Sequence, residues 1–219
     1  MLKYPCLVLD HDDTVVQSER TVNYPFFAQI LDEFRPGQTI SELSYVKGCF
    51  EPGFIEMCRE QFHFTDEELS IEYKRWQAYV RTHAASPFPG IAQIIQRQKS
   101  LGGTVCVVTQ SAEEIVSRDY ELHFGIQPDA IYSWDLPAHQ RKPSPYALEH
   151  IMQTFGYSPA ELLVVDDMKP ACDMARKANT SIAFAAWSKT EIPQILQEMT
   201  ELCDFTFHSP QELEDFLFN

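Results

Sequence analysis

A short apolar run near the start of the chain ends abruptly in acidic residues. Cys6-Leu7-Val8-Leu9 has the length and composition of a buried strand. Three carboxylates follow within four residues, at Asp10, Asp12 and Asp13. Carboxylates this close repel one another unless a cation offsets their charge. The run therefore predicts a ligand site at the carboxyl end of a buried strand, and a solvated acidic turn after an edge strand is the alternative.

The chain beyond residue 87 alternates between short apolar runs and helical patterns. The runs that read as strands are residues 105–108, 130–132, 162–165, 182–186 and 205–207. Between them lie amphipathic segments such as residues 91–101, where Ile91, Ile94, Ile95 and Leu101 are expected to share one face. Strands that alternate with helices predict an α/β fold, with a three-layer Rossmann-like parallel sheet core and helices on both faces.

The segment between the first and second strands has helical periodicity and no convincing strand. Apolar residues from Phe26 to Phe34 recur at helix spacing, and Pro36-Gly37 ends that helix. Pro52 is expected to start another helix. Prolines and a glycine at 86–90 then mark a boundary. We predict an inserted all-helical cap subdomain at residues 18–87, and a core domain made of residues 1–17 and 88–219.

Serine or threonine three residues before glutamate predicts several helix starts, because this pair can form a capping box. Such pairs occur at Thr65 with Glu68, Ser111 with Glu114, Ser158 with Glu161 and Ser209 with Glu212. Ser144-Pro145 similarly predicts an N-cap followed by a proline in the first turn of a helix that runs to about Phe155.

Charge and cysteine usage restrict the partners and the compartment. The net charge of −15 argues against nucleic acid or an anionic membrane as the main partner. The six cysteines are scattered, and Cys6, Cys106 and Cys172 lie in or beside apolar runs, which is typical of buried thiols in a reducing compartment. No signal peptide and no apolar run of membrane-spanning length is visible, so a cytoplasmic location is expected.

Three of the predicted strands end in polar residues, in an order that resembles a known family. These are Asp10 and Asp12, then Thr109, then Asp166 and Asp167, with Lys142 before a proline-started helix. The order resembles the haloacid dehalogenase-like superfamily of phosphohydrolases over nearly the whole chain. The residues that carry the resemblance are Asp10-His11-Asp12-Asp13-Thr14, Thr109, Lys142-Pro143-Ser144-Pro145, and Val165-Asp166-Asp167 followed by Ala171, Ala175 and Ala178. The helical insertion is similar to the cap of the phosphoglycolate phosphatase and β-phosphoglucomutase-like branch.

The resemblance implies a role for each residue, and the chemistry of phosphoryl transfer agrees with it. Asp10 would attack phosphorus and form an aspartyl-phosphate, while Asp12 would protonate the leaving oxygen and then activate water. Thr109 would bind phosphate oxygens, and Lys142 would offset the shared negative charge. The predicted metal ligands of Mg²⁺ are oxygen atoms of Asp10, Asp12, Asp166 and Asp167. The predicted substrate-binding residues are Thr109, Gln110, Lys142 and Lys47 of the helical segment.

Several of these residues also have ordinary structural interpretations. Thr109 taken alone is equally a helix cap, and Lys47 taken alone is at least as well explained as a surface lysine. Lys142 taken alone is better explained as a surface lysine, and only its place before Pro143 in the motif order favours a site role. Lys169 competes with Lys142 for the charge-offsetting role. His11 is expected to point away from its acidic neighbours and to have a structural or supporting role. Asp13 stands where the family usually has glycine, in a turn that aspartate tolerates better than most residues.

The sequence thus predicts a Mg²⁺-dependent phosphatase that acts on a small phosphorylated metabolite. Asp12 argues against cleavage of carbon–chlorine or carbon–phosphorus bonds, because the dehalogenases and phosphonatases of this superfamily lack an aspartate there. A phosphomutase that keeps water from the phosphoenzyme is the nearest alternative, and a catalytically silent binding or regulatory protein is the other. The sequence does not identify the substrate or the oligomeric state.

Overall fold

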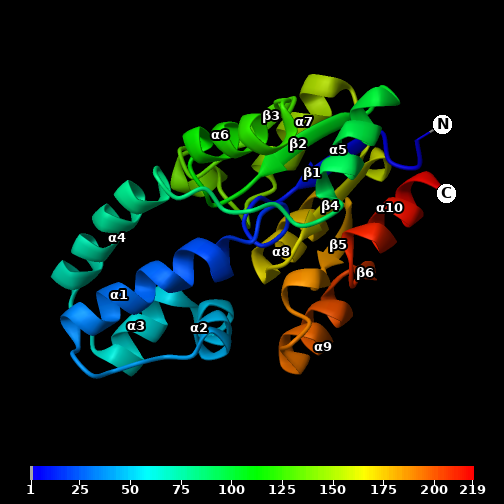
Figure 1. Ribbon diagram of the computed structural model, residues 1–219. Helices are drawn as coiled ribbons and strands as arrows, with labels where there is room; N and C mark the ends of the chain where they lie inside the picture. The colour runs from blue at the N-terminus through cyan, green and yellow to red at the C-terminus, as the bar shows by residue number, and fades with distance from the viewer. Residues whose placement is uncertain (1) are drawn as a thin grey trace. The chain divides into compact units, whose positions relative to one another are not determined.

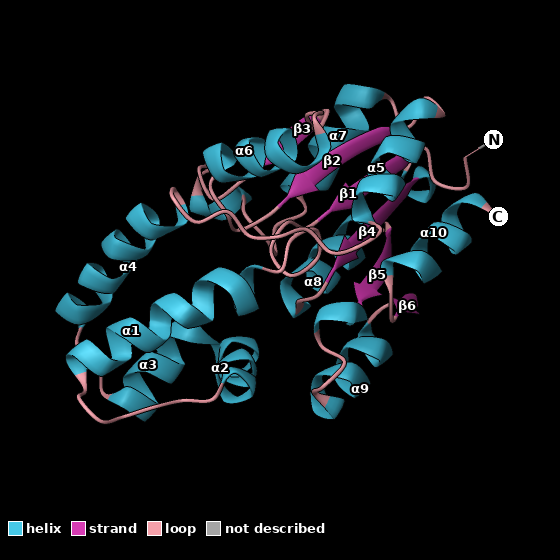
Figure 2. Ribbon diagram, in the orientation of Figure 1, coloured by secondary structure: helices cyan, strands magenta, loops and turns pink. Residues whose placement is uncertain are grey.

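The predicted α/β core is present in the computed structural model, which describes residues 2–219. Within these residues six strands form one sheet: β1 Cys6–Leu9, β2 Thr104–Val108, β3 Ala130–Tyr132, β4 Leu162–Asp166, β5 Ser181–Ala185 and β6 Phe205–Phe207. The spatial order is β3-β2-β1-β4-β5-β6, and every neighbouring pair is parallel (Figure 2). The Rossmann-like parallel sheet is therefore confirmed.

Strand β1 lies at the centre of the sheet because its side chains are apolar on both faces. Its four residues are at most 1% exposed, and they pair with β2 on one side and β4 on the other. A strand buried on both faces is expected to be continuously hydrophobic, as Cys6-Leu7-Val8-Leu9 is. The alternative of an edge strand followed by a solvated turn is wrong.

Two rows of helices cover the sheet (Figure 1). Helices α5, α6 and α10 pack side by side on one face, and α7, α8 and α9 on the other. Right-handed crossovers require this placement of the helices that connect two strands, and α10 follows the last strand. Their bounds are α5 Ile91–Ser100, α6 Glu113–Phe124, α7 Tyr146–Phe155, α8 Lys169–Ala178, α9 Pro193–Leu202 and α10 Pro210–Phe218. The expected face of α5 is buried at Ile91, Ile94 and Ile95, but Leu101 lies just past the helix end and is 58% exposed.

The chain divides into two compact units. One contains the residues up to Val16 together with Pro87–Asn219, and the other is Gln17–Ser86. The chain passes between the units twice, and these two passages run side by side: the Gln17 amide donates to the Ser86 carbonyl at 2.8 Å, and the Phe88 amide donates to the Val15 carbonyl at 3.0 Å. That the second unit acts as a cap stays a prediction.

The second unit is helical throughout, around an aromatic core. Its helices are α1 Tyr24–Phe34, α2 Glu42–Gly48, α3 Phe54–Phe62 and α4 Asp66–Val80, with short π-helical segments before α1 and α3. Phe27 is 1% exposed and packs at tilted or edge-on angles against the rings of Tyr45, Phe54, Phe62 and Phe64. Pro52 does not start a helix as expected, because Glu51 is extended and α3 begins after Gly53.

Candidate active site

The carboxyl ends of β1, β2 and β4 meet at one edge of the sheet. Asp10 and Thr109 continue the strand ladder by one residue: the Asp10 amide donates to the Val165 carbonyl, and the Thr109 amide to the Tyr132 carbonyl, each at 2.9 Å. Asp166 is the last residue of β4. The three neighbouring strands thus bring these predicted site residues together on rigid backbone, where ligands of open α/β sheets bind.

Three carboxylates form an acidic cluster at this edge, and we use that name for Asp10, Asp166 and Asp167. Each offers an oxygen within 4.8 Å of the others, and the residues are only 6%, 2% and 2% exposed. Buried carboxylates this close require positive charge nearby. An all-oxygen donor set of this kind fits a hard divalent cation such as Mg²⁺. The sequence predicted all three of these residues.

Lys142 provides one of the positive charges. Its Nζ lies 2.6 Å from Asp10 Oδ1 and 2.7 Å from Asp166 Oδ2, and its side chain is 5% exposed. It is therefore not a surface lysine. The competing candidate, Lys169, pairs instead with Glu198 at 2.6 Å. The ion pairs place Lys142 where it offsets the charge of Asp10, as the sequence predicted.

Burial and the neighbouring charges perturb the titration of this group of residues. Burial raises the pKa of Asp10 well above its ordinary value, while Lys142 opposes that rise and Asp166, Asp167 and Asp12 add to it. Burial also raises the pKa of Asp166, again against Lys142. Burial disfavours the charge of Lys142, but Asp10 and Asp166 outweigh it, so the pKa of the ammonium is raised. A strongly perturbed group of titratable residues is typical of a functional site.

A second buried lysine, Lys189, was not predicted from the sequence. Its Nζ lies 2.7 Å from Asp13 Oδ2 and 2.9 Å from Asp167 Oδ2, and its side chain is 2% exposed. Asp13 has the expected unusual backbone, with φ of 55°. A carboxylate in the glycine position is a signal that some cation must pair with it, but nothing in the sequence identifies a lysine 176 residues away.

Asp12 lies past the strand end and is half-buried. Ser111 Oγ donates to Asp12 Oδ2 at 2.5 Å, and the Ser111 amide donates to Thr109 Oγ1 at 3.1 Å. The prediction that Ser111 caps a helix is wrong: α6 starts at Glu113 with Ala112 in the N-cap position. The Ser111 hydroxyl instead orients the predicted acid–base residue, and Ser111 is the second site residue that the sequence did not predict.

The other residues that the sequence singled out differ in their burial and in their contacts. Thr109 is buried beside Ser111, and Gln110 is exposed on the same loop. His11 is fully buried, with Nε2 3.1 Å from Asp119 Oδ2, so it anchors the β1 loop to α6 as a structural residue. Lys47 is half-buried on α2 of the helical unit, and its role in substrate binding stays a prediction.

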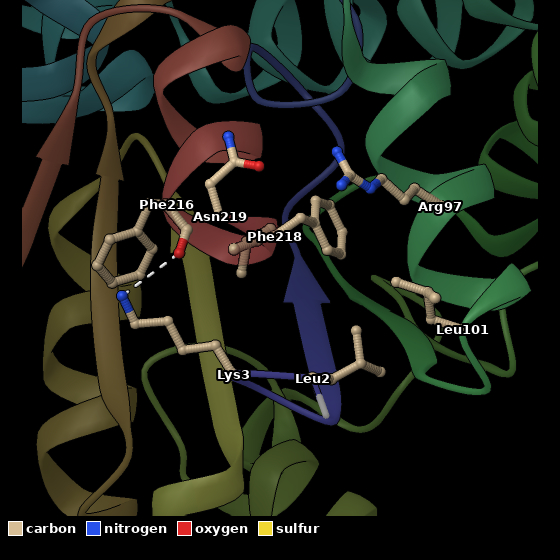
Figure 3. Close-up of a pocket in the computed structure, with 8 residues that line it drawn as sticks. Leu2, Lys3, Arg97, Leu101, Phe216, Phe218 and Asn219 are labelled. Atoms are coloured by element: carbon tan, nitrogen blue, oxygen red, sulfur yellow. Dashed lines mark hydrogen bonds between the residues drawn. The ribbon is translucent and has the colours of Figure 1, made fainter.

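A separate pocket of about 610 Å³ opens at the other end of the sheet (Figure 3). Its lining includes Leu2 and Lys3, which precede β1, and Arg97 on α5, together with residues of α10. Lys3 Nζ donates to the Phe216 carbonyl at 3.3 Å and lies 3.4 Å from the centre of the Phe216 aromatic ring. Because Asp10 follows the opposite end of β1, this pocket is distinct from the acidic site.

Comparison with known proteins agrees with the residues at the acidic site. The family model described as haloacid dehalogenase-like hydrolase matches residues 7–185, a span that begins in β1 and ends at the last residue of β5. The chain belongs to this hydrolase family. The match therefore contains all the predicted core motifs, from Asp10 to Asp167.

One curated relative and two solved structures match nearly the whole length of this hydrolase. A phosphoglycolate phosphatase from Aquifex aeolicus is 22% identical over 218 residues, which cover 97% of this chain and 96% of the relative. A crystal structure of a predicted phosphoglycolate phosphatase from Haemophilus somnus 129pt has a TM-score of 0.75 at 16% identity and covers 99% of both chains. The D10N mutant of CbbY from Rhodobacter sphaeroides, in complex with xylulose-(1,5)bisphosphate, has a TM-score of 0.67 at 17% identity, covering 97% of this chain and 96% of CbbY.

These structural similarities show a shared fold, including the core sheet. In residues 2–219 of this hydrolase, no helix combines the length and apolar character needed to cross a bilayer.

Proposed function

We propose that the chain is a Mg²⁺-dependent phosphatase that hydrolyses a small phosphate monoester through an aspartyl-phosphate on Asp10. One observation carries the proposal: Asp10 is buried within the acidic cluster beside Lys142, while Asp12, two residues later, is half-buried and accepts a hydrogen bond from Ser111. Two carboxylates in such different surroundings suit two different tasks.

Asp10 has the position of a nucleophile, and it needs nearby positive charge to be ionised, because burial raises its pKa. Burial favours its neutral form, but the Lys142 ammonium at 2.6 Å favours the carboxylate. Its backbone is fixed by the bond to Val165, so the side chain can approach phosphorus from a constant direction. A Mg²⁺ ion held by Asp10, Asp166 and Asp167 would supply further positive charge toward the phosphoryl oxygens.

Asp12 has the properties of an acid and base. It is less buried than Asp10, and the Ser111 hydroxyl holds one of its oxygens. It would give its proton to the leaving alcohol oxygen as the bond from Asp10 to phosphorus forms. It would then take a proton from the water that hydrolyses the phosphoenzyme.

The similar proteins suggest which substrates to test first. The Aquifex relative is a phosphoglycolate phosphatase, and CbbY was crystallised with a sugar bisphosphate. Both compounds are small phosphate monoesters, so phosphoglycolate and sugar phosphates are the first compounds to test. Specificity would come from the helical unit, where Lys47 is the candidate for pairing with a second anionic group.

The test is phosphate release from a panel of phosphorylated metabolites, with Mg²⁺ and with EDTA. We expect release that requires Mg²⁺ and is lost in Asp167→Asn. Asp173→Asn is the matched control, because Asp173 is an exposed carboxylate on α8 that pairs with Arg176. Full activity in EDTA would contradict the metal dependence. Isomerised sugar phosphate without release would indicate a phosphomutase, and no turnover of any ester would indicate a silent binding protein.

A further inference from the structure

Asp13 and Lys189 form a buried charge pair at the edge of the acidic cluster, and no step proposed above uses it. Lys189 Nζ lies 2.7 Å from Asp13 Oδ2 and 2.9 Å from Asp167 Oδ2. Asp13 is 6% exposed and Lys189 is 2% exposed. Burying charged groups is costly unless they are paired, so this arrangement requires both partners.

Backbone structure fixes both members of the charge pair. The Asp13 amide donates to the Val16 carbonyl at 2.7 Å in the turn that follows β1. The Lys189 amide donates to the Ala186 carbonyl at 3.0 Å in the helical turn that follows β5. Asp167, the third member of the contact, follows β4. The pair therefore joins loops that follow three different strands of the sheet.

The formal charges suggest why Lys189, which contacts Asp167, is also paired with Asp13. The acidic cluster has three carboxylates and one bound ammonium, Lys142, which leaves a formal charge of −2. This charge complements a divalent cation. Lys189 alone would reduce it to −1, and Asp13 restores it to −2.

We propose that Lys189 is a positioning residue that holds Asp167 for the metal ion, and that Asp13 keeps this contact from weakening metal binding by neutralising Lys189. The inference rests on the proposed Mg²⁺-dependent function. The ammonium holds one carboxylate oxygen of Asp167 and so restricts its orientation. Groups that orient a metal ligand in this way contribute about 10- to 100-fold to metal affinity.

The proposal predicts a rescue that a purely structural pair would not produce. Asp13→Asn removes one negative charge, keeps the side-chain shape and tolerates the positive φ. It leaves Lys189 unbalanced beside Asp167, so the affinity for Mg²⁺ should fall about 10-fold or more. Adding Lys189→Gln to Asp13→Asn restores the formal charge of −2 and keeps an N–H donor for Asp167, so the double variant should bind Mg²⁺ more tightly than Asp13→Asn.

The measurement is isothermal titration of the metal-free protein with MgCl₂ alone, which does not depend on turnover. Thermal unfolding in EDTA checks that each variant folds, and Asp13→Gly replaces Asp13→Asn if the latter does not, because glycine adopts positive φ freely. Asp173→Asn serves again as the control and should leave the affinity unchanged.

An unchanged Mg²⁺ affinity in Asp13→Asn would overturn the proposal. So would a double variant that binds as weakly as Asp13→Asn or more weakly, because additive losses indicate only a structural contact. These results would leave the proposed function intact. If the unaltered chain itself does not bind Mg²⁺, the proposed function fails and this inference fails with it.

Discussion

Glu72 is a buried carboxylic acid in the helical unit, and replacing it should stabilise that unit in a pH-dependent way. It lies on α4 and is 5% exposed. Burial raises its pKa from 4.5 to about 7. Burial also raises the pKa of Cys58 to about 12, and Glu72 adds to that rise, which places the carboxylate near the buried thiol. Glu72→Gln keeps the shape of the side chain and removes the charge.

The size and sign of this change in stability follow from the pKa of Glu72 in the folded and unfolded states. Because the folded pKa is the higher one, the folded state binds the proton more tightly than the unfolded state does. Below about pH 4.5 both states are protonated and burial has no ionisation cost. As the pH rises through 7, folding becomes less favourable by up to about 3 kcal/mol, since one pKa unit corresponds to about 1.4 kcal/mol.

Urea unfolding at pH 5 and pH 8 provides the assay. At pH 8 Glu72→Gln should raise the free energy of unfolding by about 2–3 kcal/mol, and at pH 5 by less than about 1 kcal/mol. Glu60→Gln, on the exposed side of α3, is the control and should change the free energy by less than about 0.5 kcal/mol at either pH. Equal stabilisation at both values of pH, or destabilisation at pH 8, would refute the reasoning.

Two further predictions concern the site and the passages between the units. Ser111→Ala removes the hydrogen-bond donor to Asp12, and turnover should fall about 10- to 100-fold, because a hydrogen bond to a charged group contributes about 1.5–3 kcal/mol. Steady-state kinetics with alkyl and nitrophenyl phosphates will measure the loss. An equal loss with both substrates would contradict a role of Ser111 in orienting the acid–base residue. If the helical unit closes over substrate, amide exchange at Gln17 and Phe88 should slow with a phosphate analogue, and unchanged exchange would argue against closure.

Much of the core could be predicted because its signals are local. The strands that contain Val8 and Val164 are buried on both faces, so they are continuous apolar runs with abrupt polar ends. Once β1 and β4 pair in parallel, with Leu9 opposite Val165, the residues that follow, Asp10 and Asp166, lie side by side. The capping box at Thr65 also formed as expected, since both of its bonds lie within four residues.

The parts that sequence reasoning missed depend on contacts between distant residues. Ser111 with Glu114 has the same pattern as Thr65 with Glu68, but Ser111 donates to Asp12, 99 residues away, and the helix starts later. Lys189 follows β5 with no motif to distinguish it from other lysines. Its importance follows only from the fold, which places it against Asp13 and Asp167. Local patterns could not predict either contact.

The central claim is that Asp10 and Asp12 have different tasks, and rapid-quench trapping of the phosphoenzyme tests it most directly. The reaction is stopped with acid during turnover of a ³²P-labelled substrate with Mg²⁺, and the labelled residue is identified by mass spectrometry. We predict phosphate on Asp10 in the unaltered chain and none in Asp10→Asn. With nitrophenyl phosphate, whose leaving group needs no acid, the phosphoenzyme should accumulate in Asp12→Asn, because the base that activates water is lost. Phosphate on Asp12, or a phosphoenzyme that persists in Asp10→Asn, would contradict the account.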